Sequence, residues 1–304
     1  MNVLIVKTGA TGDVVRTTPL LSRLDGHVTW LTEAKNTVLL EGLNDDLRCV
    51  SWEERVRALD MQYDLVINLE DTLDVAQFLK TVRCSQLFGA YLDSNNLLGY
   101  TEESRRWFDL SLISSYGREE ADRLKFQNRR TYQDLIFEGL GFRFVGEPYL
   151  LPEPVETELS GDVAIATEAG PVWPMKRWAY HDELKQQLER LGLTVNILPK
   201  RSSLLEHLSD VQNHRCLVGG DSLPMHFALG TATRCVTLFT CTSPWEIYDY
   251  GIQKKIISPL LREFFYKRGY DNRATTAISV NEVLQAVMSQ LKTTAPAATA
   301  PTTG

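Results

Sequence analysis

The sequence lacks the features of a membrane, secreted or disordered protein. Its 304 residues include only five cysteines, which are widely spaced and form no CxxC pair, so neither a disulfide framework nor a zinc site is expected. We interpret these cysteines as small buried hydrophobic residues. No apolar run approaches the ~20 residues that a membrane-spanning helix needs. The start of the chain carries no basic segment or cleavage site, so we expect no signal peptide and a cytoplasmic location.

Positive charge is also scarce. The chain has 32 lysines and arginines against 39 aspartates and glutamates, a net charge of −7, so most of its surface should repel polyanions. We therefore expect no stable nucleic-acid partner. Hydrophobic residues make up 43% and charged residues 23%, a globular composition, and the length suits about two domains of roughly 150 residues each.

Short apolar runs alternate with amphipathic stretches along the chain. The runs typical of buried parallel strands are residues 3–6, 28–31, 65–68, 162–166, 195–198, 216–218 and 235–239. Helical periodicity occurs at residues 14–24, 73–81, 129–140, 181–191, 223–229 and 281–291. This alternation predicts an α/β fold with parallel sheets and right-handed crossovers.

The alternation is interrupted once and then starts again. Pro152 and Pro154 fix an extended backbone, and a new strand–helix series follows from residue 162. We predict two doubly wound Rossmann-like domains, residues 1–155 and 156–292, with a ligand-binding cleft at the carboxyl ends of their strands. Residues 293–304 contain no large apolar side chain, and we expect a disordered tail.

The first loop that could carry chemistry is KTGATGDV, residues 7–14, between a strand and a helix. Its glycines allow close backbone approach to a ligand at a helix N-terminus, but they match neither GxGxxG nor a Walker loop. Asp13 is either an ordinary helix N-cap or a carboxylate that accepts a proton in the cleft.

The second loop is residues 167–178, which contain WPMKRW. Lys176 and Arg177 lie between two tryptophans, in a loop stiffened by two prolines. Two adjacent cations at this place can bind a diphosphate. The alternative is a solvated pair of surface charges, which contributes little.

Two further loops follow predicted strands in the second half of the chain. In residues 218–226, Gly219 and Gly220 precede Asp221 and Ser222, so the backbone amides and the helix start can form an anion site, with His226 one turn into the helix.

Residues 239–248 follow the next predicted strand. The hydroxyl of Thr242 suits phosphate or sugar oxygens. Ser243-Pro244 also fits a plain helix N-cap followed by proline at the first helical position.

A basic stretch lies in the otherwise acidic N-terminal half. It consists of Arg105, Arg106, Arg118, Arg123, Lys125, Arg129 and Arg130. A solvated helix face is one interpretation. The other is a patch for a phosphorylated or carboxylated acceptor at the cytoplasmic face of the inner membrane. The same patch could serve another polyanion, including modified DNA.

Together these motifs resemble glycosyltransferase family 9, the heptosyltransferase-like enzymes that build the inner core of bacterial lipopolysaccharide. LIVKTGATGDVVRTTPLL, WPMKRW, GGDSLPMHFALG and LFTCTSPWEIYDYG occur in the family's order, over residues 3 to about 287. The resemblance implies a GT-B fold, two Rossmann-like domains with an interdomain cleft. The N-terminal domain would bind the acceptor and the C-terminal domain the nucleotide sugar, which is ADP-heptose in the best-known members.

The resemblance also implies roles for individual residues. Asp13 matches the family's proposed general base, Lys176 a lysine on the donor phosphates, and Thr167 a nucleotide- or phosphate-binding threonine. Asp221 and His226 match the donor loop. The predicted donor site is Thr167, Lys176, Arg177, Gly219, Gly220, Asp221, Ser222, Met225, His226 and Thr242, and the predicted acceptor site is Thr11, Gly12, Arg105 and Arg106.

We therefore expect an inverting, metal-independent glycosyltransferase that moves a sugar, heptose by resemblance, from a nucleotide-diphosphate donor to a lipopolysaccharide-core or other glycan hydroxyl. Asp13 would take the acceptor proton, and Lys176 and the loop amides would stabilise the leaving diphosphate. No DxD motif stands at a predicted strand end, so neither a metal nor another cofactor is expected.

Two features depart from the family pattern. Leu223 stands where the donor loop usually has glycine, and residues 261–276 lack the cysteine cluster of a protein-modifying branch. The alternatives are a same-fold transferase acting on a protein or modified nucleic acid, and an NAD(P)-dependent oxidoreductase, whose third loop glycine is missing. A catalytically silent nucleotide-sugar-binding protein would lack Asp13 or Lys176, and both are present.

Overall fold

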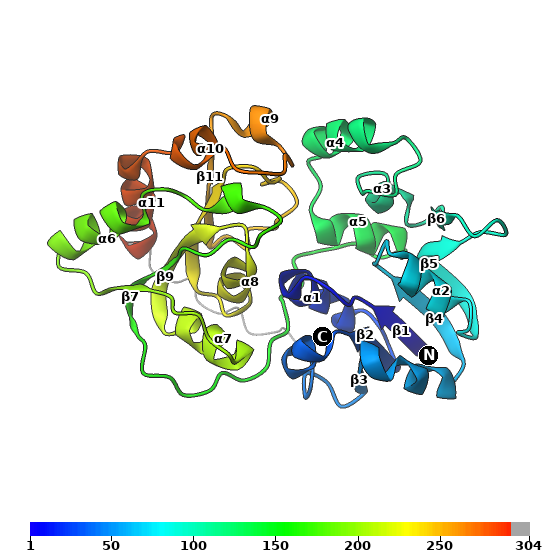
Figure 1. Cartoon of the computed structure of the whole chain (residues 1–304). Helices are drawn as coiled ribbons and strands as arrows, with labels where there is room; N and C mark the ends of the chain where they lie inside the picture. The colour runs from blue at the N-terminus through cyan, green and yellow to red at the C-terminus, as the bar shows by residue number, and fades with distance from the viewer. Residues whose placement is uncertain (293–304) are drawn as a thin grey trace.

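The chain forms two α/β lobes that lie side by side in the computed structural model, which describes residues 1–292 (Figure 1). A six-stranded sheet of order β3-β2-β1-β4-β5-β6 is the centre of the N-terminal lobe, and a five-stranded sheet of order β11-β10-β9-β7-β8 is the centre of the C-terminal lobe. The predicted tail, 293–304, lies outside the described residues.

The N-terminal sheet is parallel except at one edge, where β5 and β6 pair antiparallel. Its strands are β1 (Asn2–Val6), β2 (His27–Thr32), β3 (Leu47–Ser51), β4 (Tyr63–Asn68), β5 (Cys84–Leu92) and β6 (Leu98–Tyr100). The α-helices of this lobe are α1 (Thr11–Thr17), α2 (Leu73–Leu79), α3 (Arg105–Phe108), α4 (Arg118–Gln127) and α5 (Tyr132–Gly139). Three 3₁₀ segments complete it: η1 (Thr18–Ser22), η2 (Ala34–Leu39) and η3 (Trp52–Asp60).

The C-terminal sheet is parallel throughout its described pairs. Its strands are β7 (Gly161–Ala166), β8 (Val195–Ile197), β9 (His214–Gly220), β10 (Arg234–Phe239) and β11 (Gln253–Ile257). Its helices are η4 (Pro174–Lys176), α6 (His181–Arg190), α7 (Leu204–Gln212), α8 (Leu223–Gly230), α9 (Leu261–Phe264), α10 (Asn272–Thr276) and α11 (Val280–Lys292).

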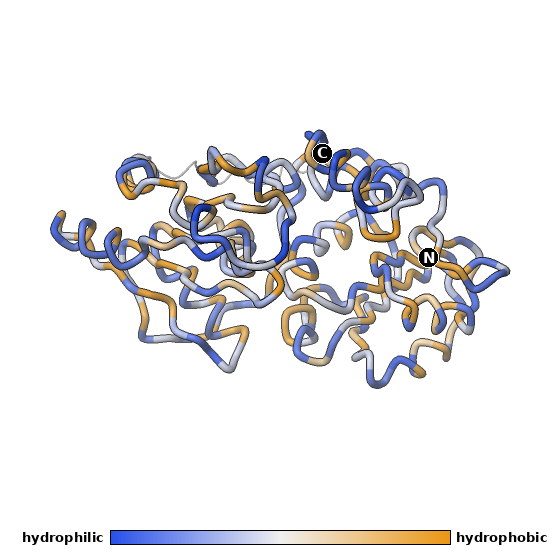
Figure 2. The backbone as a smooth tube through the Cα atoms, turned by 45° about the horizontal axis from the view of Figure 1, so that its top comes forward, coloured by the Kyte–Doolittle hydropathy of each residue, from blue (hydrophilic) through white to orange (hydrophobic). Residues whose placement is uncertain are grey.

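The central strand β1 explains why its sequence is continuously apolar. Val3 and Ile5 pack into the cluster that includes α5, whereas Leu4 and Val6 pack into the cluster that includes α2. Both faces of this sheet are therefore covered, as in doubly wound folds. In Figure 2 hydrophobic stretches run along the inner strands, and the trace of α6 at the left edge is mostly hydrophilic.

The predicted doubly wound α/β architecture is confirmed, with corrections in detail. All seven predicted strands overlap strands of the structure. The sheets are not wholly parallel, because β6 returns from β5 as a hairpin. The helix predicted over 14–24 ends at Thr17, and the chain tightens to a 3₁₀ turn with Pro19 in its first positions.

The helix predicted from residue 129 begins at Tyr132. Thr131 caps it by accepting the Asp134 N–H, and the Asp134 carboxylate accepts the Thr131 N–H in return.

The two lobes share an apolar interface. Val15 of α1 and Tyr149 belong to the same buried cluster as Met225 and Phe227 of α8. Residues 140–160 connect the lobes without helix or strand, and the boundary that we predict at residues 155 and 156 falls inside this segment. Burial of apolar surface on both sides of the connection fixes how α1 and α8 face each other.

The cysteines are all unpaired, and no helix in residues 1–292 is long and apolar enough to cross a bilayer. Cys216, Cys235 and Cys241 are buried, as expected. Cys84 is exposed, which corrects the prediction for that residue, because it opens β5 at the edge where the strand leaves the core.

Candidate active site

A cavity of about 470 Å³ is lined by residues of both lobes. Helices α1 and α8, one from each lobe, contact each other there (Figure 1). Eight of the predicted site residues line it: Thr11, Gly12, Asp13, Lys176, Asp221, Ser222, His226 and Thr242. They come from the loops and helix starts that follow β1, β7, β9 and β10. The carboxyl ends of strands from both sheets therefore converge on one space, as in other open α/β sheets.

Asp13 is the third residue of α1 and not its N-cap. The N-cap is Ala10, which has a left-handed φ of 50°, and its carbonyl accepts the Asp13 N–H at 2.7 Å. The interpretation of Asp13 as an N-cap is therefore wrong. Its carboxylate lies 2.8 Å from the Arg16 guanidinium and 3.9 Å from the Lys7 amine. It keeps about a third of its side-chain surface exposed (31%), so a ligand can reach it from the cavity.

The charges around Asp13 keep it ionised. Burial raises the pKa of the Asp13 carboxyl, but the positive charges of Arg16 and Lys7 hold the pKa below its ordinary value. The pKa of Lys7 is raised well above its usual range, because Asp13 and Glu70 together outweigh its burial. The carboxylate can accept a hydrogen bond from an acceptor hydroxyl.

A buried glutamate, which the sequence analysis did not assign to the site, holds the loop in this shape. Glu70 follows β4, the strand beside β1, and is 8% exposed. Its carboxylate accepts bonds from the Lys7 amine (2.9 Å) and from the backbone N–H groups of Thr8 (2.7 Å) and Gly9 (3.2 Å). The available signal was an acidic residue at the end of a strand expected to neighbour β1.

On the C-terminal wall, Asp221 is fixed by Lys176. The Lys176 amine donates to the Asp221 carbonyl at 2.6 Å and lies 3.3 Å from its carboxylate. Burial raises the pKa of Asp221, but Lys176 and other positive neighbours bring it to about 2. A Cβ on Gly220 would lie 2.8 Å from the Lys176 carbonyl, so this close approach requires glycine.

His226, on the C-terminal wall, lies close to Gly12 of the N-terminal wall. It is 4% exposed, its Nδ1 lies 3.4 Å from the Tyr149 hydroxyl, and a Cβ on Gly12 would lie 2.8 Å from its ring. Burial, and after it the Arg16 charge, lowers the pKa of His226 to about 4, so the ring is neutral at pH 7. The glycine at residue 12 is therefore required by packing across the cavity.

The hydroxyls after β10 face the same cavity without a helix. The segment after Phe239 contains no helix at Ser243-Pro244, so the interpretation of Ser243 as an N-cap is wrong. Thr242 and Ser243 are each 2% exposed and line the cavity. The Ser243 Oγ has no hydrogen-bond partner among the described residues. A buried unpaired hydroxyl costs free energy until a ligand satisfies it.

Several predicted site residues lie elsewhere. Arg177 lines a separate cavity together with His181, whereas Lys176 lines the first cavity, so the two cations do not face the same space as predicted. Met225 is buried in the core, and the Gly219 backbone packs against Ala166.

Of the basic stretch, Lys125 lines the cavity and the six arginines do not. Arg105 and Arg106 pair with Glu102 and Glu138 at 2.7 and 2.6 Å. Arg118, Arg123 and Arg130 also pair with neighbouring carboxylates. These five arginines form a solvated, internally neutralised surface, so Arg105 and Arg106 do not reach the predicted acceptor site.

Sequence reasoning gave no site role to four other residues that line the cavity: Arg16, Trp173, Glu246 and Tyr266. It named Lys125 only as part of the basic stretch. Trp173 and Glu246 belong to the motifs, which gave no reason to separate them from core residues. Arg16 and Lys125 are brought in by α1 and α4, and only the packing of the two lobes reveals them.

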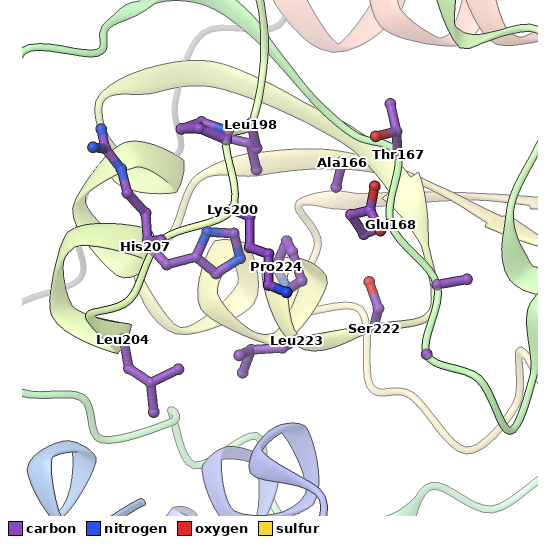
Figure 3. Close-up of a pocket in the computed structure, with 14 residues that line it drawn as sticks. Ala166, Thr167, Glu168, Leu198, Lys200, Leu204, His207, Ser222, Leu223 and Pro224 are labelled. Atoms are coloured by element: carbon purple, nitrogen blue, oxygen red, sulfur yellow. The ribbon is translucent and has the colours of Figure 1, made fainter. Parts of the chain in front are cut away.

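A second cavity of about 390 Å³ lies next to the first and shares Ser222 and Leu223 with it (Figure 3). Thr167 lines this cavity instead of the first one. Leu198 and Leu204 form apolar parts of its wall, and the polar side chains of Lys200 and His207 also line it. Glu168, Lys200 and Arg201 also line this cavity, so it combines apolar wall with charged side chains.

Among residues 1–292, no group of three or more His, Cys, Asp or Glu side chains is arranged to hold a metal ion.

Comparison with known proteins finds a family model that matches part of the C-terminal lobe. Residues 172–269 match the model of glycosyltransferase family 9 (heptosyltransferase). A comparison with curated proteins found no match.

Solved structures share the fold over nearly the whole chain. The Escherichia coli heptosyltransferase WaaC with ADP aligns with a TM-score of 0.62 and 15% identity, over 95% of this chain and 100% of that chain. A family 9 glycosyltransferase from Veillonella parvula aligns at 0.64 and 17%, over 95% and 97%. The E. coli ADP-heptose lps heptosyltransferase II aligns at 0.58 and 16%, over 96% and 98%. The predicted GT-B fold is confirmed, and the match to the family 9 model covers residues 172–269, within the C-terminal lobe of that fold.

Proposed function

We propose that the chain is an inverting, metal-independent glycosyltransferase that moves a heptose from a nucleoside-diphosphate donor to a hydroxyl of a lipopolysaccharide-core or other glycan acceptor. One observation carries the proposal: Asp13 of the N-terminal lobe and the Lys176–Asp221 pair of the C-terminal lobe line the same cavity. A proton acceptor and a cationic site for a leaving group thus lie on opposite walls.

Asp13 acts as the general base. The acceptor hydroxyl binds beside Thr11 and Gly12 and gives its proton to the Asp13 carboxylate as its oxygen attacks the anomeric carbon. Attack on the face opposite the leaving group inverts the anomeric centre in a single displacement. The bond from that carbon to the diphosphate oxygen breaks, and its electron pair leaves with the nucleoside diphosphate.

The C-terminal wall stabilises the leaving group. The diphosphate gathers negative charge as the sugar departs, and the Lys176 amine and the Ser222 backbone at the start of α8 are placed to compensate it. Asp221 orients the Lys176 amine and is available to sugar or ribose hydroxyls. The neutral His226 ring can donate or accept a hydrogen bond without adding charge.

The nucleoside occupies the second cavity, between Leu198 and Leu204. Two of the similar solved structures carry ADP and ADP-2-deoxy-2-fluoro heptose, which favours an adenine nucleotide and a heptose here. Thr167 lies at this nucleoside pocket.

The donor is tested by thermal shift with ADP-, UDP-, GDP- and dTDP-linked sugars. Binding adds RT ln(1 + [L]/Kd) to the free energy of unfolding, so the true donor stands out at equal concentration. We expect ADP-heptose to raise Tm most. A response to none of the four classes, or a response to NAD(P) alone, would contradict the proposal.

Metal independence is tested by chelation. We expect release of nucleoside diphosphate from ADP-heptose, with a lipopolysaccharide-core oligosaccharide as acceptor, to persist in excess EDTA. Full loss of release that Mg²⁺ restores would overturn the metal-free mechanism.

A further inference from the structure

The Arg16 guanidinium lies between two carboxylates that belong to different lobes. One of its terminal nitrogens is 2.8 Å from Asp13, and the other is 4.0 Å from Glu246, in the loop after β10. The side chain of Arg16 is 12% exposed. A single buried cation is thus shared unequally between the proposed general base and an acid from the opposite lobe.

Packing holds the Arg16 guanidinium in this position. Its central carbon lies 4.1 Å from the centre of the Tyr132 ring, the first residue of α5. The Tyr132 N–H donates to the Glu246 carbonyl at 2.9 Å, so the same tyrosine is tied to the C-terminal lobe. The Arg16 Nε has no hydrogen-bond partner among the described residues. The guanidinium therefore has unused donor capacity.

Glu246 is a buried acid whose neighbours are cations from the N-terminal lobe. It is 4% exposed, and its Oε1 has no hydrogen-bond partner in the described part of the chain. The Lys125 amine of α4 lies 3.5 Å from Oε1 and 4.2 Å from the centre of the Tyr266 ring. A buried carboxylate without a hydrogen bond is expensive unless nearby positive charge compensates it. Glu246 therefore depends on Arg16 and Lys125.

We propose that Glu246 is a positioning residue for the reaction: by attracting the Arg16 guanidinium from the opposite lobe, it weakens the hold of Arg16 on Asp13 and keeps that carboxylate basic enough to take the acceptor proton. This inference rests on the proposed role of Asp13. A carboxylate bound only to Arg16 and Lys7 is a poor base, because both cations favour its ionised form. Glu246 competes with Asp13 for Arg16, and this competition reduces how far Arg16 lowers the basicity of Asp13. Glu246 has this effect without touching the substrate.

Other charged groups also face these residues. Asp13 is approached by Lys7, which directly follows β1, and by Asp221 and His226 of the C-terminal lobe. Arg16 is approached by Asp221 as well, which lies on the same lobe as Glu246. The test must therefore separate the path through Arg16 from a general change of charge in the cavity.

A double-mutant cycle makes this separation. With ADP-heptose and a core oligosaccharide at pH 7, we expect Glu246→Gln to lower kcat about 3- to 10-fold with the donor KM within twofold, because the base weakens. In an Arg16→Gln background the same substitution should leave kcat unchanged. The matched control is Glu138→Gln, which removes an acid paired with surface arginines outside the cavity, and its kcat should equal that of the wild type.

Glu246→Asp provides a conservative variant that keeps the charge on a shorter side chain. It should fall between the wild type and Glu246→Gln in kcat, and it keeps the proposal testable if the glutamine variant does not fold. An unchanged kcat in both Glu246 variants would overturn the proposal. The same loss in both Arg16 backgrounds would also overturn it, because Glu246 would then act independently of Arg16.

A second readout needs no turnover and separates this proposal from the proposed function. The ¹³C carboxyl signal of Asp13, assigned by its loss in Asp13→Asn, reports the Asp13 pKa. In Lys125→Met, Glu246 has Arg16 as its remaining cation, so the Asp13 pKa should rise. The rise should vanish in the Lys125→Met/Glu246→Gln double variant, and a rise that persists there would contradict the coupling. If Asp13→Asn keeps its turnover, the general-base role fails, whereas this titration still decides whether Glu246 acts on Asp13.

Discussion

Asp13 of the N-terminal lobe and Asp221 of the C-terminal lobe both line the shared cavity, and their neighbours hold them differently. Asp221 contacts a cation of its own lobe, Lys176, which also binds the Asp221 carbonyl, and only 15% of its side chain is exposed. Asp13 lies between Arg16 and Lys7 and keeps 31% of its side chain exposed. Both loops follow the carboxyl end of a central parallel strand, so the difference comes from neighbours and not from the fold.

We interpret this difference as one between a fixed charge, Asp221, and a reactive one, Asp13. Asp221, with a pKa of about 2, stays ionised and holds Lys176 in place for a diphosphate. Asp13 is also ionised, but 31% of its side chain is exposed and it shares Arg16 unequally with Glu246, and in the proposed mechanism it takes the acceptor proton. The predictions below test whether the N-terminal wall performs the chemistry and the C-terminal wall the donor binding.

The largest effect is expected on the N-terminal wall. Asp13→Asn should lower kcat by about 10²–10⁴-fold, the usual contribution of a positioned general base, with donor affinity nearly unchanged. Initial rates of nucleoside diphosphate release and the thermal-shift Kd for the donor measure the two quantities. Near-normal turnover would show that Asp13 is not the general base. It would also contradict the division of chemistry and donor binding between the two walls.

The matching change on the C-terminal wall is Lys176→Met. It leaves Asp221 without its nearest cation and the diphosphate without its charged donor, so donor affinity and kcat should fall together. A charge-assisted hydrogen bond contributes about 1.5–3 kcal/mol, which corresponds to roughly a 10- to 100-fold weaker donor Kd. A loss of kcat with an unchanged donor Kd would contradict the assignment of this wall to donor binding.

The contact between the walls is tested at Gly12. Gly12→Ala places a methyl group 2.8 Å from the buried His226 ring, so the lobes must separate or the ring must shift. We expect a loss of about 1–3 kcal/mol in the free energy of unfolding, measured by urea denaturation, together with weaker donor binding. Gly9→Ala is the control, because its new methyl group would meet only the Glu33 carboxylate at an ordinary 3.7 Å. Equal stability of the two variants would show that the packing against His226 is not tight.

The smallest effect concerns pH. The pKa of His226 in the folded chain is about 4, below its ordinary 6.5, so the folded state binds fewer protons than the unfolded state between these values. The contribution of His226 to the free energy of unfolding is therefore complete above pH 6.5 and is lost as the pH drops toward 4. Between pH 7 and 5 this residue alone lowers the free energy of unfolding by about 2 kcal/mol. His226→Gln should lose correspondingly less stability over that range in urea denaturation.

The exposed His27→Gln serves as the control for the removal of a histidine and should leave the acid loss as large as in the wild type. An equally steep acid loss in His226→Gln would show that other groups cause it.

Local sequence was sufficient for most of the fold. The run at residues 3–6 is apolar at every position, because both faces of β1 are covered, and such runs are recognisable without a structure. The strand β5 was missed because its first three residues, beginning with Cys84, are exposed at the end of the sheet and carry no buried pattern. The helix α4 was missed for a similar reason, since Ala121 is its only buried residue.

The candidate site, like the fold, contains residues that the sequence could identify and residues that it could not. Asp13, Lys176 and Asp221 lie in short motifs, so a resemblance to family 9 could assign them. Arg177 shows the limit of such motifs: it follows Lys176 directly, yet the backbone turns after η4 and Arg177 lines another cavity. Neighbours in sequence need not face the same space.

What the sequence by itself determined is the doubly wound architecture, the four strand-end loops and the residues that resemble a family, because strand periodicity and loop motifs are local properties of the chain. What only the tertiary structure decided is the electrostatics of the cavity. Arg16 and Glu246 are 230 positions apart, and their separation of 4.0 Å exists because an apolar interface presses α1 against α8. Charge–charge energies depend on distance and burial, which are set only when the two lobes pack together.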